Sequence, residues 1–221
     1  MIKYREIHLV IGADAKVISM AAHIRFAKPT DAAGILAIYG PYCESTCISF
    51  EIVAPTIEQI QERISRITVN YPWLVGEIDG QIAGYVYASR HHERAAYRWS
   101  VDVAVYVAAG HQRRGVGRIL YETLFSILRE QGYFKAFAGI TLPNPASVGL
   151  HESLGFRPAA IFRGVGHKFG RWLDVGWWQR DLQPERDNPT DPHPFSSMHD
   201  SPIVSAALAE GRCRLAAEIG V

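Results

Sequence analysis

The stretch Val103–Leu120, VAVYVAAGHQRRGVGRIL, passes from an apolar run into two arginines and two glycines, and then into apolar residues at helical spacing. Residues 99–107 indicate a β-strand, and residues 116–132 indicate a helix. The start of a helix exposes backbone N–H groups and partial positive charge, which suit an anion. Gly115 and Gly117 lack the β-carbons that would keep a bulky phosphate away from those amides. The turn therefore predicts a phosphate site, and a diphosphate fits it best.

Two familiar phosphate loops differ from this turn. A Walker loop needs lysine and then serine or threonine after its second glycine, whereas Gly117 is followed by Arg118 and Ile119. A Rossmann turn needs a third glycine within a parallel βαβ unit, whereas the strands expected before this turn form an antiparallel meander. Both loops are disfavoured. On this stretch alone, an arginine-rich turn before an ordinary helix is an equal alternative.

Strand and helix patterns surround this stretch. Four isoleucines within residues 55–68 recur every three or four positions, as on one face of a helix. Asp79-Gly80 joins two β-branched and aromatic runs and tolerates the positive φ of a tight hairpin turn. The expected elements are a strand at 23–27, helices at 32–43 and 55–68, a hairpin at 72–89, strands at 99–107 and 134–142, a short helix at 144–155, and strands at 156–170 and 171–182. Together they predict an α/β (α+β) domain.

The length of the chain suggests one domain with additions at both ends. At 221 residues it is long enough for one well-filled α/β domain and a tail. We expect an N-terminal extension over 1–21, with Met20 as an alternative start, and a single domain over 22–183. Residues 184–221 begin as a linker rich in proline and polar residues. Their last part could form a helix interrupted at Gly211, which packs back, pairs with a partner or stays mobile.

Charge and cysteine content narrow the function classes. The formal net charge is +1, which argues against a nucleic-acid partner. No apolar run reaches the roughly 18 residues of a membrane helix, and Asp14 and Lys16 interrupt what would be the core of a signal peptide. Cys43, Cys47 and Cys213 form no CxxC pair and have no histidine at metal spacing. We expect a reduced, cytoplasmic protein without a metal site, a nucleic-acid partner or a membrane partner.

Five blocks of sequence, in order, resemble one family of enzymes. The turn Gln112–Gly117 fits the pattern of the GNAT superfamily of N-acetyltransferases, Gln or Arg followed by x-x-Gly-x-Gly, and the resemblance covers about residues 24–182. The blocks YPWLVGEIDGQIAGYVYAS, ERAAYRWSVDVAVYV, HQRRGVG, LPNPASVGLHESLGF and GHKFGRWLDVGWWQ are similar to the phosphinothricin and methionine sulfoximine acetyltransferase subfamily. The resemblance implies a GNAT fold: a mixed, mostly antiparallel sheet with a splayed parallel strand pair, flanked by helices.

The resemblance also implies acetyl-CoA as the co-substrate. The turn would hold its diphosphate, and its pantetheine arm would lie between the splayed strands, bonded to backbone groups of Val105 and Val107. Asn144 would bond the pantetheine or cap its own helix. The candidates for cofactor binding are Val105, Tyr106, Val107, Gln112, Arg113, Arg114, Gly115, Val116, Gly117, Arg118, Asn144 and Ser147.

Three residues are candidates for proton transfer. Asp102 interrupts an apolar strand just before the cofactor segment, and a carboxylate there can take the ammonium proton directly or through water. The subfamily usually has glutamate here, so Asp102 is one methylene shorter, and Glu51 is a second candidate. On the strand alone, Asp102 is more simply an aspartate on a solvent face. His151 stands where many relatives have a tyrosine that protonates the leaving thiolate, and a structural, hydrogen-bonded histidine is an equal alternative.

The acceptor that the resemblance implies is a small amino-acid analogue of the phosphinothricin, methionine sulfoximine or methionine sulfone type. The candidates for substrate binding are Phe50, Arg94, Tyr97, Trp99 and Lys168. Solvated surface charge or core packing explains several of these residues equally well. The alternative functions are transfer to another small amine or to a protein N-terminus, and a non-catalytic sensor of coenzyme A. Trp172, Trp177 and Trp178 predict an aromatic interface and hence a homodimer.

Overall fold

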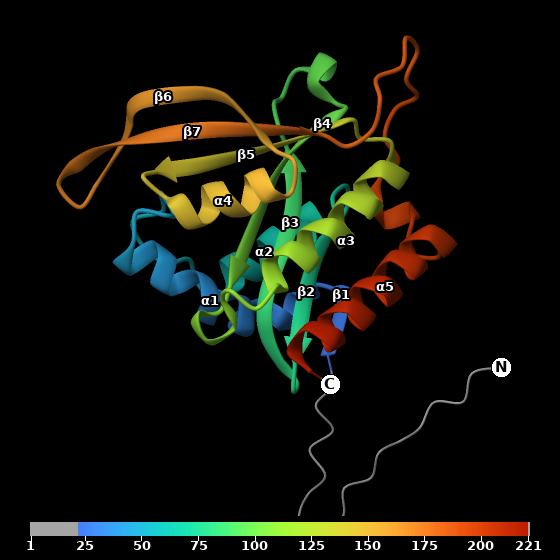
Figure 1. Ribbon diagram of the computed structural model, residues 1–221, viewed down its shortest axis with the longest axis horizontal. Helices are drawn as coiled ribbons and strands as arrows, with labels where there is room; N and C mark the ends of the chain where they lie inside the picture. Colours follow the sequence, from blue (N-terminus) through green and yellow to red (C-terminus); the bar gives the residue numbers. More distant parts are fainter. Residues whose placement is uncertain (1–21, 221) are drawn as a thin grey trace, which may run out of the picture.

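The computed structural model describes residues 22–220, so the extension expected over 1–21 lies outside the described residues (Figure 1). The strands of this part are β1 (Ala22–Phe26), β2 (Trp73–Ile78), β3 (Gln81–Arg90), β4 (Ser100–Val107), β5 (Lys135–Leu142), β6 (Arg157–Lys168) and β7 (Arg171–Asp181). The α-helices are α1 (Ala32–Ser45), α2 (Ile57–Ile67), α3 (Val116–Gln131), α4 (Pro145–Ser153) and α5 (Pro202–Ile219). The predicted elements are present in their predicted order.

One sheet contains all of these strands, in the order β1-β2-β3-β4-β5-β7-β6. Every neighbouring pair is antiparallel except β4 and β5. The parallel pair is joined only between Ser100–Asp102 and Lys135–Phe137, and past Asp102 the two strands diverge (Figure 1). The predicted mixed sheet with a splayed parallel pair is confirmed.

Two turns follow from residues with a left-handed backbone. Asp79 and Gly80 have φ angles of 53° and 75°, and they close the β2–β3 hairpin as their dipeptide predicts. Gly132, with a φ of 96°, is the C-cap of α3. Both turns set the lengths of the elements that carry the candidate site.

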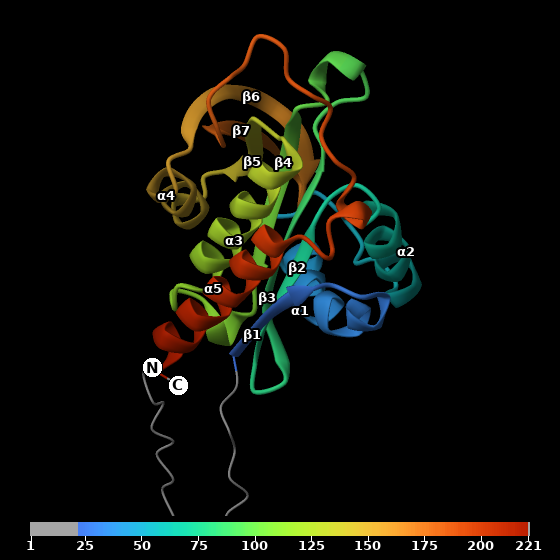
Figure 2. The same ribbon diagram turned by 90° about the vertical axis from the view of Figure 1, so that its right-hand side faces the viewer.

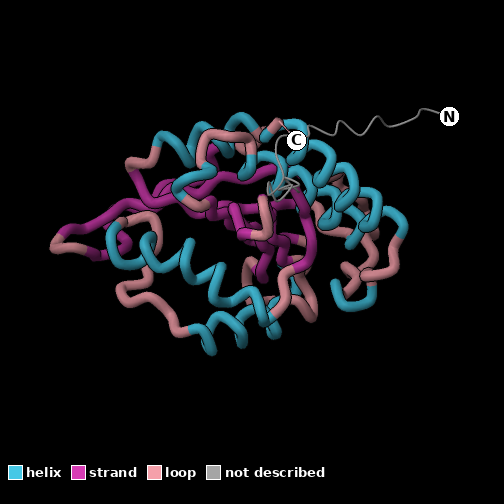
Figure 3. Tube along the Cα trace, turned by 90° about the horizontal axis from the view of Figure 1, so that it is seen from below, coloured by secondary structure: helices cyan, strands magenta, loops and turns pink. Residues whose placement is uncertain are grey.

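Helices cover both faces of the sheet (Figures 2 and 3). On one face α3 lies along β2, β3 and β4, with α5 packed on α3, and on the other face lie α1 and α2. Alternate side chains of β4 point to opposite layers. Val101 and Val103 therefore join the main core around α3, whereas Tyr106 packs against the smaller core under α1 and α2. The strand β4 thus separates two environments.

The C-terminal segment packs on the domain, which differs from the expected linker. Phe195 is buried in the main core, and its ring lies edge-on against Phe26 at a centroid distance of 4.8 Å. The predicted interruption at Gly211 is wrong, because α5 continues through this residue. A β-carbon on Gly211 would lie 2.4 Å from Thr123 Oγ1, so the glycine lets α5 approach α3 closely. Of the alternatives for this segment, packing back on the domain is the one observed.

Candidate active site

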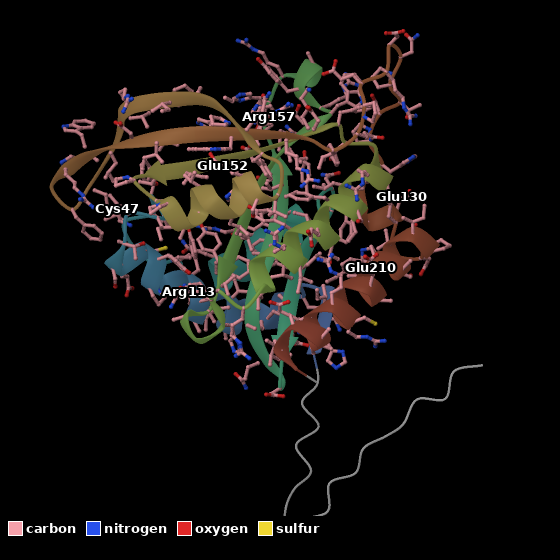
Figure 4. All side chains as sticks on the ribbon, viewed as in Figure 1. Cys47, Arg113, Glu130, Glu152, Arg157 and Glu210 are labelled. Carbon is pink, nitrogen blue, oxygen red and sulfur yellow. The ribbon has the colours of Figure 1, made fainter. Side chains whose placement is uncertain are left out.

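The turn between β4 and α3 has the geometry of an anion site. Gly115 is the N-cap of α3, with a left-handed φ of 69° and no side-chain cap, so no capping side chain takes up the first N–H groups of the helix. Arg113 is also left-handed, with a φ of 57°, which is uncommon for a residue that has a β-carbon. Arg113 and Arg114 are exposed, and Figure 4 shows Arg113 on this turn. Backbone amides and cations are therefore available at one place, as a diphosphate requires.

The open edge of β4 leads into this turn. Past Asp102, residues 103–107 have no β5 partner, so the backbone groups on that edge have no strand to pair with. The side chains of Val105 and Val107 pack against the main core, as expected. Tyr42 Oη donates to the carbonyl oxygen of Val107 at 2.9 Å, so this acceptor has a partner within the protein. The remaining edge fits a ligand arm that carries amides.

Two of the predicted diphosphate residues are tied to other helices. Gln112 Nε2 donates to Tyr42 Oη of α1 at 2.9 Å. Arg118 Nη2 donates to Ser153 Oγ of α4 at 2.7 Å. These hydrogen bonds hold the turn and the first turn of α3 against their neighbours. Among residues 22–220, Arg113 and Arg114 form no ion pair, so they are the cations left for an anion.

The predicted residues of α4 mainly stabilise the fold. Asn144 Oδ1 accepts a hydrogen bond from the Ser147 N–H at 3.1 Å, which is the capping interpretation of this residue. His151 is 4% exposed; its Nδ1–H donates to the Ser147 carbonyl oxygen at 2.7 Å, and its Nε2 accepts from the Tyr121 hydroxyl at 3.0 Å. Burial lowers the pKa of His151, and the hydrogen bond to Ser147 opposes this shift. Because both ring nitrogens have partners inside the core, the geometry favours a structural histidine.

Asp102 lies where β4 and β5 separate. It is the last residue of β4 paired with β5, and it stands opposite Phe137. Its side chain is 31% exposed, and its Oδ1 lies 2.7 Å from His91 Nδ1. Burial raises the pKa of Asp102, and the hydrogen bond with His91 opposes this shift. A half-buried carboxylate therefore stands at the mouth of the gap between the splayed strands.

Sequence reasoning missed the histidine beside Asp102. Ser89 pairs with Asp102 in the β3–β4 register, and β3 ends at Arg90. His91 is the first residue beyond β3, two positions after Ser89, and its side chain lies on the same side as Asp102. The His91 ring stacks on Phe137, with centroids 4.2 Å apart and planes 8° apart. A sequence signal was present, because two histidines follow directly on a predicted strand. Only the strand register gives one of them its partner.

One predicted acceptor residue, Tyr97, lies close to this pair, and a second, Arg94, lines a cavity beside Tyr97. The Tyr97 ring is 5.9 Å from the His91 ring, at an interplanar angle of 74°. Tyr97 and Arg94 both line a cavity of about 340 Å³ between the β3–β4 loop and residues 191–194. Asp102 does not line this cavity, and His91 stands between Tyr97 and the carboxylate. The loop therefore brings the Tyr97 ring to the His91–Asp102 pair, whereas Arg94 faces the cavity.

The other three predicted acceptor residues make different contacts. The indole N–H of Trp99 donates to the Thr190 carbonyl oxygen at 2.8 Å, which ties it to the C-terminal segment. The Phe50 ring lies over Gly166, where a β-carbon would come within 2.0 Å of it. Lys168 is 4% exposed, and its ammonium group donates to three backbone carbonyl oxygens. These belong to Cys43, Ser49 and Glu51, at 2.6, 2.7 and 2.8 Å. Lys168 therefore has no hydrogen left for a substrate carboxylate, and it anchors the α1–α2 loop.

Glu51 is a weaker candidate for the base than Asp102. Arg63 Nη1 and Nη2 donate to its two carboxylate oxygens at 2.6 and 3.1 Å. Tyr39 Oη donates to one of the same oxygens at 3.1 Å. By contrast, Asp102 has one oxygen to which nothing in residues 22–220 donates. The geometry favours Asp102.

No group of three histidine, cysteine, aspartate or glutamate side chains within residues 22–220 is arranged to hold a metal ion. None of the helices in this range is both long and apolar enough to cross a membrane.

Comparison with known proteins gives this geometry a family. Residues 24–177 match the acetyltransferase (GNAT) domain. The phosphinothricin N-acetyltransferase of Streptomyces viridochromogenes is 40% identical over 160 residues, which cover 72% of this chain and 87% of the relative. The L-methionine sulfoximine/L-methionine sulfone acetyltransferase of Salmonella typhimurium is 36% identical over 160 residues, with 72% and 94% covered.

Solved structures agree with this match. The GNAT superfamily phosphinothricin acetyltransferase from Sinorhizobium meliloti, in complex with acetyl-CoA, has a TM-score of 0.72 at 30% identity. The similarity covers 80% of this chain and 99% of that one. The chain therefore belongs to the GNAT acetyltransferase family. It is an N-acetyltransferase.

Proposed function

We propose that this enzyme uses acetyl-CoA to acetylate the amine of a small amino-acid analogue of the phosphinothricin, methionine sulfoximine or methionine sulfone type. Relatives named for these substrates share 35–40% identity with most of the domain. The relative from Sinorhizobium meliloti contains acetyl-CoA, which supports the same acetyl donor here. The acceptor is a small molecule that presents one free amine.

The observation that carries the proposal is the place of Asp102. The pairing of β4 with β5 stops at this residue, so a carboxylate stands where the gap between the strands opens. The gap continues along residues 103–107 to the turn at Gly115, whose amides suit a diphosphate. An acetyl group carried at the far end of a pantetheine arm would therefore reach Asp102.

The residues of the chain divide the chemistry between them. Acetyl-CoA supplies the activated acetyl thioester. The amides at Gly115, together with Arg113 and Arg114, hold the diphosphate and so place the thioester along β4. The acceptor arrives as an ammonium ion and must lose a proton before it can attack, which the carboxylate of Asp102 makes possible. Attack by the amine forms the C–N bond and breaks the C–S bond, and coenzyme A leaves as a thiolate that takes a proton from solvent. Arg94 offers a charge for the acceptor carboxylate.

A panel of amines tests this proposal. Purified enzyme with acetyl-CoA is assayed for release of coenzyme A on phosphinothricin, methionine sulfoximine, methionine sulfone, simple primary amines and peptides with free N-termini. We expect the highest kcat/KM with an amino-acid analogue. Higher kcat/KM with a peptide or with a simple amine contradicts the acceptor class. Tight binding of acetyl-CoA without transfer to any amine supports a non-catalytic sensor instead.

We also propose that the enzyme acts as a homodimer. The β6–β7 hairpin projects from the domain (Figure 1), and apolar side chains on it and on the α1–α2 loop are exposed. Trp172 is 71% exposed, whereas Trp178 is 6% exposed, so only part of the predicted aromatic surface is available. Exposed apolar patches are typical of interfaces. Light scattering at micromolar concentration should give twice the chain mass for the wild type and less for Trp172→Arg. A wild-type mass of one chain contradicts the dimer.

A further inference from the structure

The hydrogen bond between His91 and Asp102 fixes where the protons lie. An ionised carboxylate only accepts hydrogen bonds, so when Asp102 is charged, His91 Nδ1 carries the hydrogen of the 2.7 Å contact. A neutral imidazole has one N–H, and therefore its other nitrogen, Nε2, holds a free electron pair. Within residues 22–220 no group hydrogen-bonds to Nε2. The pair thus presents a basic nitrogen rather than only a carboxylate.

The ring of His91 is held in one orientation at the mouth of the gap. Its side chain is 11% exposed and stacks on Phe137, the β5 residue that pairs with Asp102. Trp177 and Tyr97 meet it edge-on, with ring centroids 6.1 and 5.9 Å away. The imidazole therefore lies over the last joined pair of β4 and β5, where the strands begin to separate.

We propose that His91 Nε2 is the atom that accepts the proton of the acceptor amine, and that Asp102 is the positioning residue that orients it. The N–H bond of the ammonium ion breaks, the Nε2–H bond forms, and the amine keeps the electron pair with which it attacks. Asp102 holds the Nδ1–H tautomer and stabilises the imidazolium. The proton then leaves to solvent. This inference rests on the proposed function of the same site.

The position of the imidazole supports this division of roles. His91 Nδ1 contacts Asp102 Oδ1, so Nε2, on the other side of the ring, extends beyond the carboxylate. The titratable groups near His91 are Asp102 on β4 and, in the β3–β4 loop, His92 and Tyr97. The rings that face His91 from β5 and β7, Phe137 and Trp177, are uncharged.

His91→Gln is the first test, because glutamine can still donate to Asp102 but has no basic nitrogen. We expect kcat/KM at pH 7 to fall by roughly 10²–10⁴-fold, with the Kd of acetyl-CoA unchanged. The loss should shrink at high pH, where the amine arrives deprotonated. His23→Gln, an exposed histidine on β1, is the matched control and should leave activity unchanged. A loss of less than about twofold in His91→Gln, or a loss of the same size at every pH, overturns the proposal.

Chemical rescue and a double substitution distinguish two hypotheses: that His91 is the base, and that Asp102 is the base without His91. In His91→Ala, added imidazole should restore part of the activity at pH 7, in proportion to the concentration of its neutral form. The double variant His91→Gln/Asp102→Asn should be no slower than His91→Gln, because the two groups act as one unit. A double variant that is slower by the product of both single effects contradicts this. The assays use whichever amine the wild type acetylates, so an error in acceptor class leaves the test of His91 intact. If the wild type acetylates no amine, both proposals fall.

Discussion

The candidate site has two parts along β4, a cofactor side and an acceptor side, and they are built in different ways. The proposed cofactor side consists of backbone groups and glycines that are contiguous in the sequence, from residue 103 to the start of α3. The proposed acceptor side consists of side chains from separate segments: His91 after β3, Asp102 in β4 and Phe137 in β5. A contiguous motif with a physical purpose is recognisable in a sequence. A cluster of side chains that strand pairing brings together is visible only in the folded structure. If the two sides differ in this way, substitutions on one side should leave the function of the other intact.

Gly117→Glu should have the largest effect, because it places a carboxylate where we propose that the cofactor side binds a diphosphate. Like charges at close range cost several kcal/mol, so the Kd of acetyl-CoA should rise on the order of 100-fold or more. A β-carbon on Gly117 would make only ordinary contacts, and an acidic residue is favourable in the first turn of a helix, so the variant should still fold, which a thermal unfolding curve checks. Calorimetric titration with acetyl-CoA measures the loss.

Gly117→Ala separates added charge from added bulk. A β-carbon on Gly117 would lie 3.4 Å from Leu150 Cδ2, which is an ordinary contact, so the protein itself accepts alanine. We expect acetyl-CoA affinity to fall far less in this variant than in Gly117→Glu. Unchanged binding by Gly117→Glu would show that the diphosphate lies elsewhere and that the cofactor side has been wrongly located.

His151→Ala should reduce the stability of the protein rather than its catalytic activity, although the sequence made His151 a candidate for proton transfer. The substitution leaves a cavity and removes the partner of the buried Tyr121 hydroxyl, which costs about 2–4 kcal/mol of unfolding free energy. Urea unfolding measures this loss. Activity per folded molecule should stay near that of the wild type, and a large fall in kcat at retained folding would restore His151 as the acid for the leaving thiolate.

The same residue predicts a pH dependence of stability. The pKa of His151 is lowered in the folded protein, so the unfolded chain binds more protons below the ordinary histidine value of about 6.5. The contribution of the neutral side chain is complete above that pH and is lost as pH falls towards the lowered pKa. Urea midpoints between pH 8 and pH 5 should therefore decline, and His151→Gln should flatten the decline. Equal slopes for the two proteins would contradict the buried neutral histidine.

Glu218→Gln should have the smallest effect. The Glu218 side chain of α5 lies against the diphosphate turn, since a β-carbon on Gly115 would come within 2.8 Å of its carboxylate carbon. Removal of this nearby negative charge should tighten acetyl-CoA binding by about two- to fivefold, and less at high salt. Glu210→Gln, earlier on the same helix and labelled in Figure 4, is the matched control and should leave the Kd unchanged. Weaker binding by Glu218→Gln would mean that this contact supports the turn.

The fold was largely predictable because its local signals agree with its packing. The Asp79-Gly80 turn, the apolar spacing of α2 and the glycine cap of α3 all predicted what is observed. The C-terminal segment was misjudged for the opposite reason. It has no apolar periodicity before α5, yet Phe195 and Met198 enter the core. Two anchoring side chains in a polar, proline-rich segment do not produce a periodic pattern.

The candidate site was predictable on one side of β4 only. The two glycines and the start of a helix predicted the turn between β4 and α3, and the structure contains this turn. Lys168 was expected as a surface charge or a substrate ligand, but three distant carbonyl groups enclose it. His91 was missed because its partner is 11 positions away and is brought to it by strand register. The two histidines were visible in the sequence, but the partner of His91 was not, because only the pairing of β3 with β4 gives that contact.

The central claim is that the two sides of β4 act separately, one binding acetyl-CoA and the other removing the proton of the acceptor. The most direct measurement combines calorimetric titration of acetyl-CoA with steady-state kinetics on Asp102→Asn. We predict an unchanged Kd for acetyl-CoA and a kcat/KM lower by roughly 10²–10⁴-fold at pH 7, with a smaller loss at high pH. Loss of acetyl-CoA binding together with activity, or near-normal activity at pH 7, would contradict the claim.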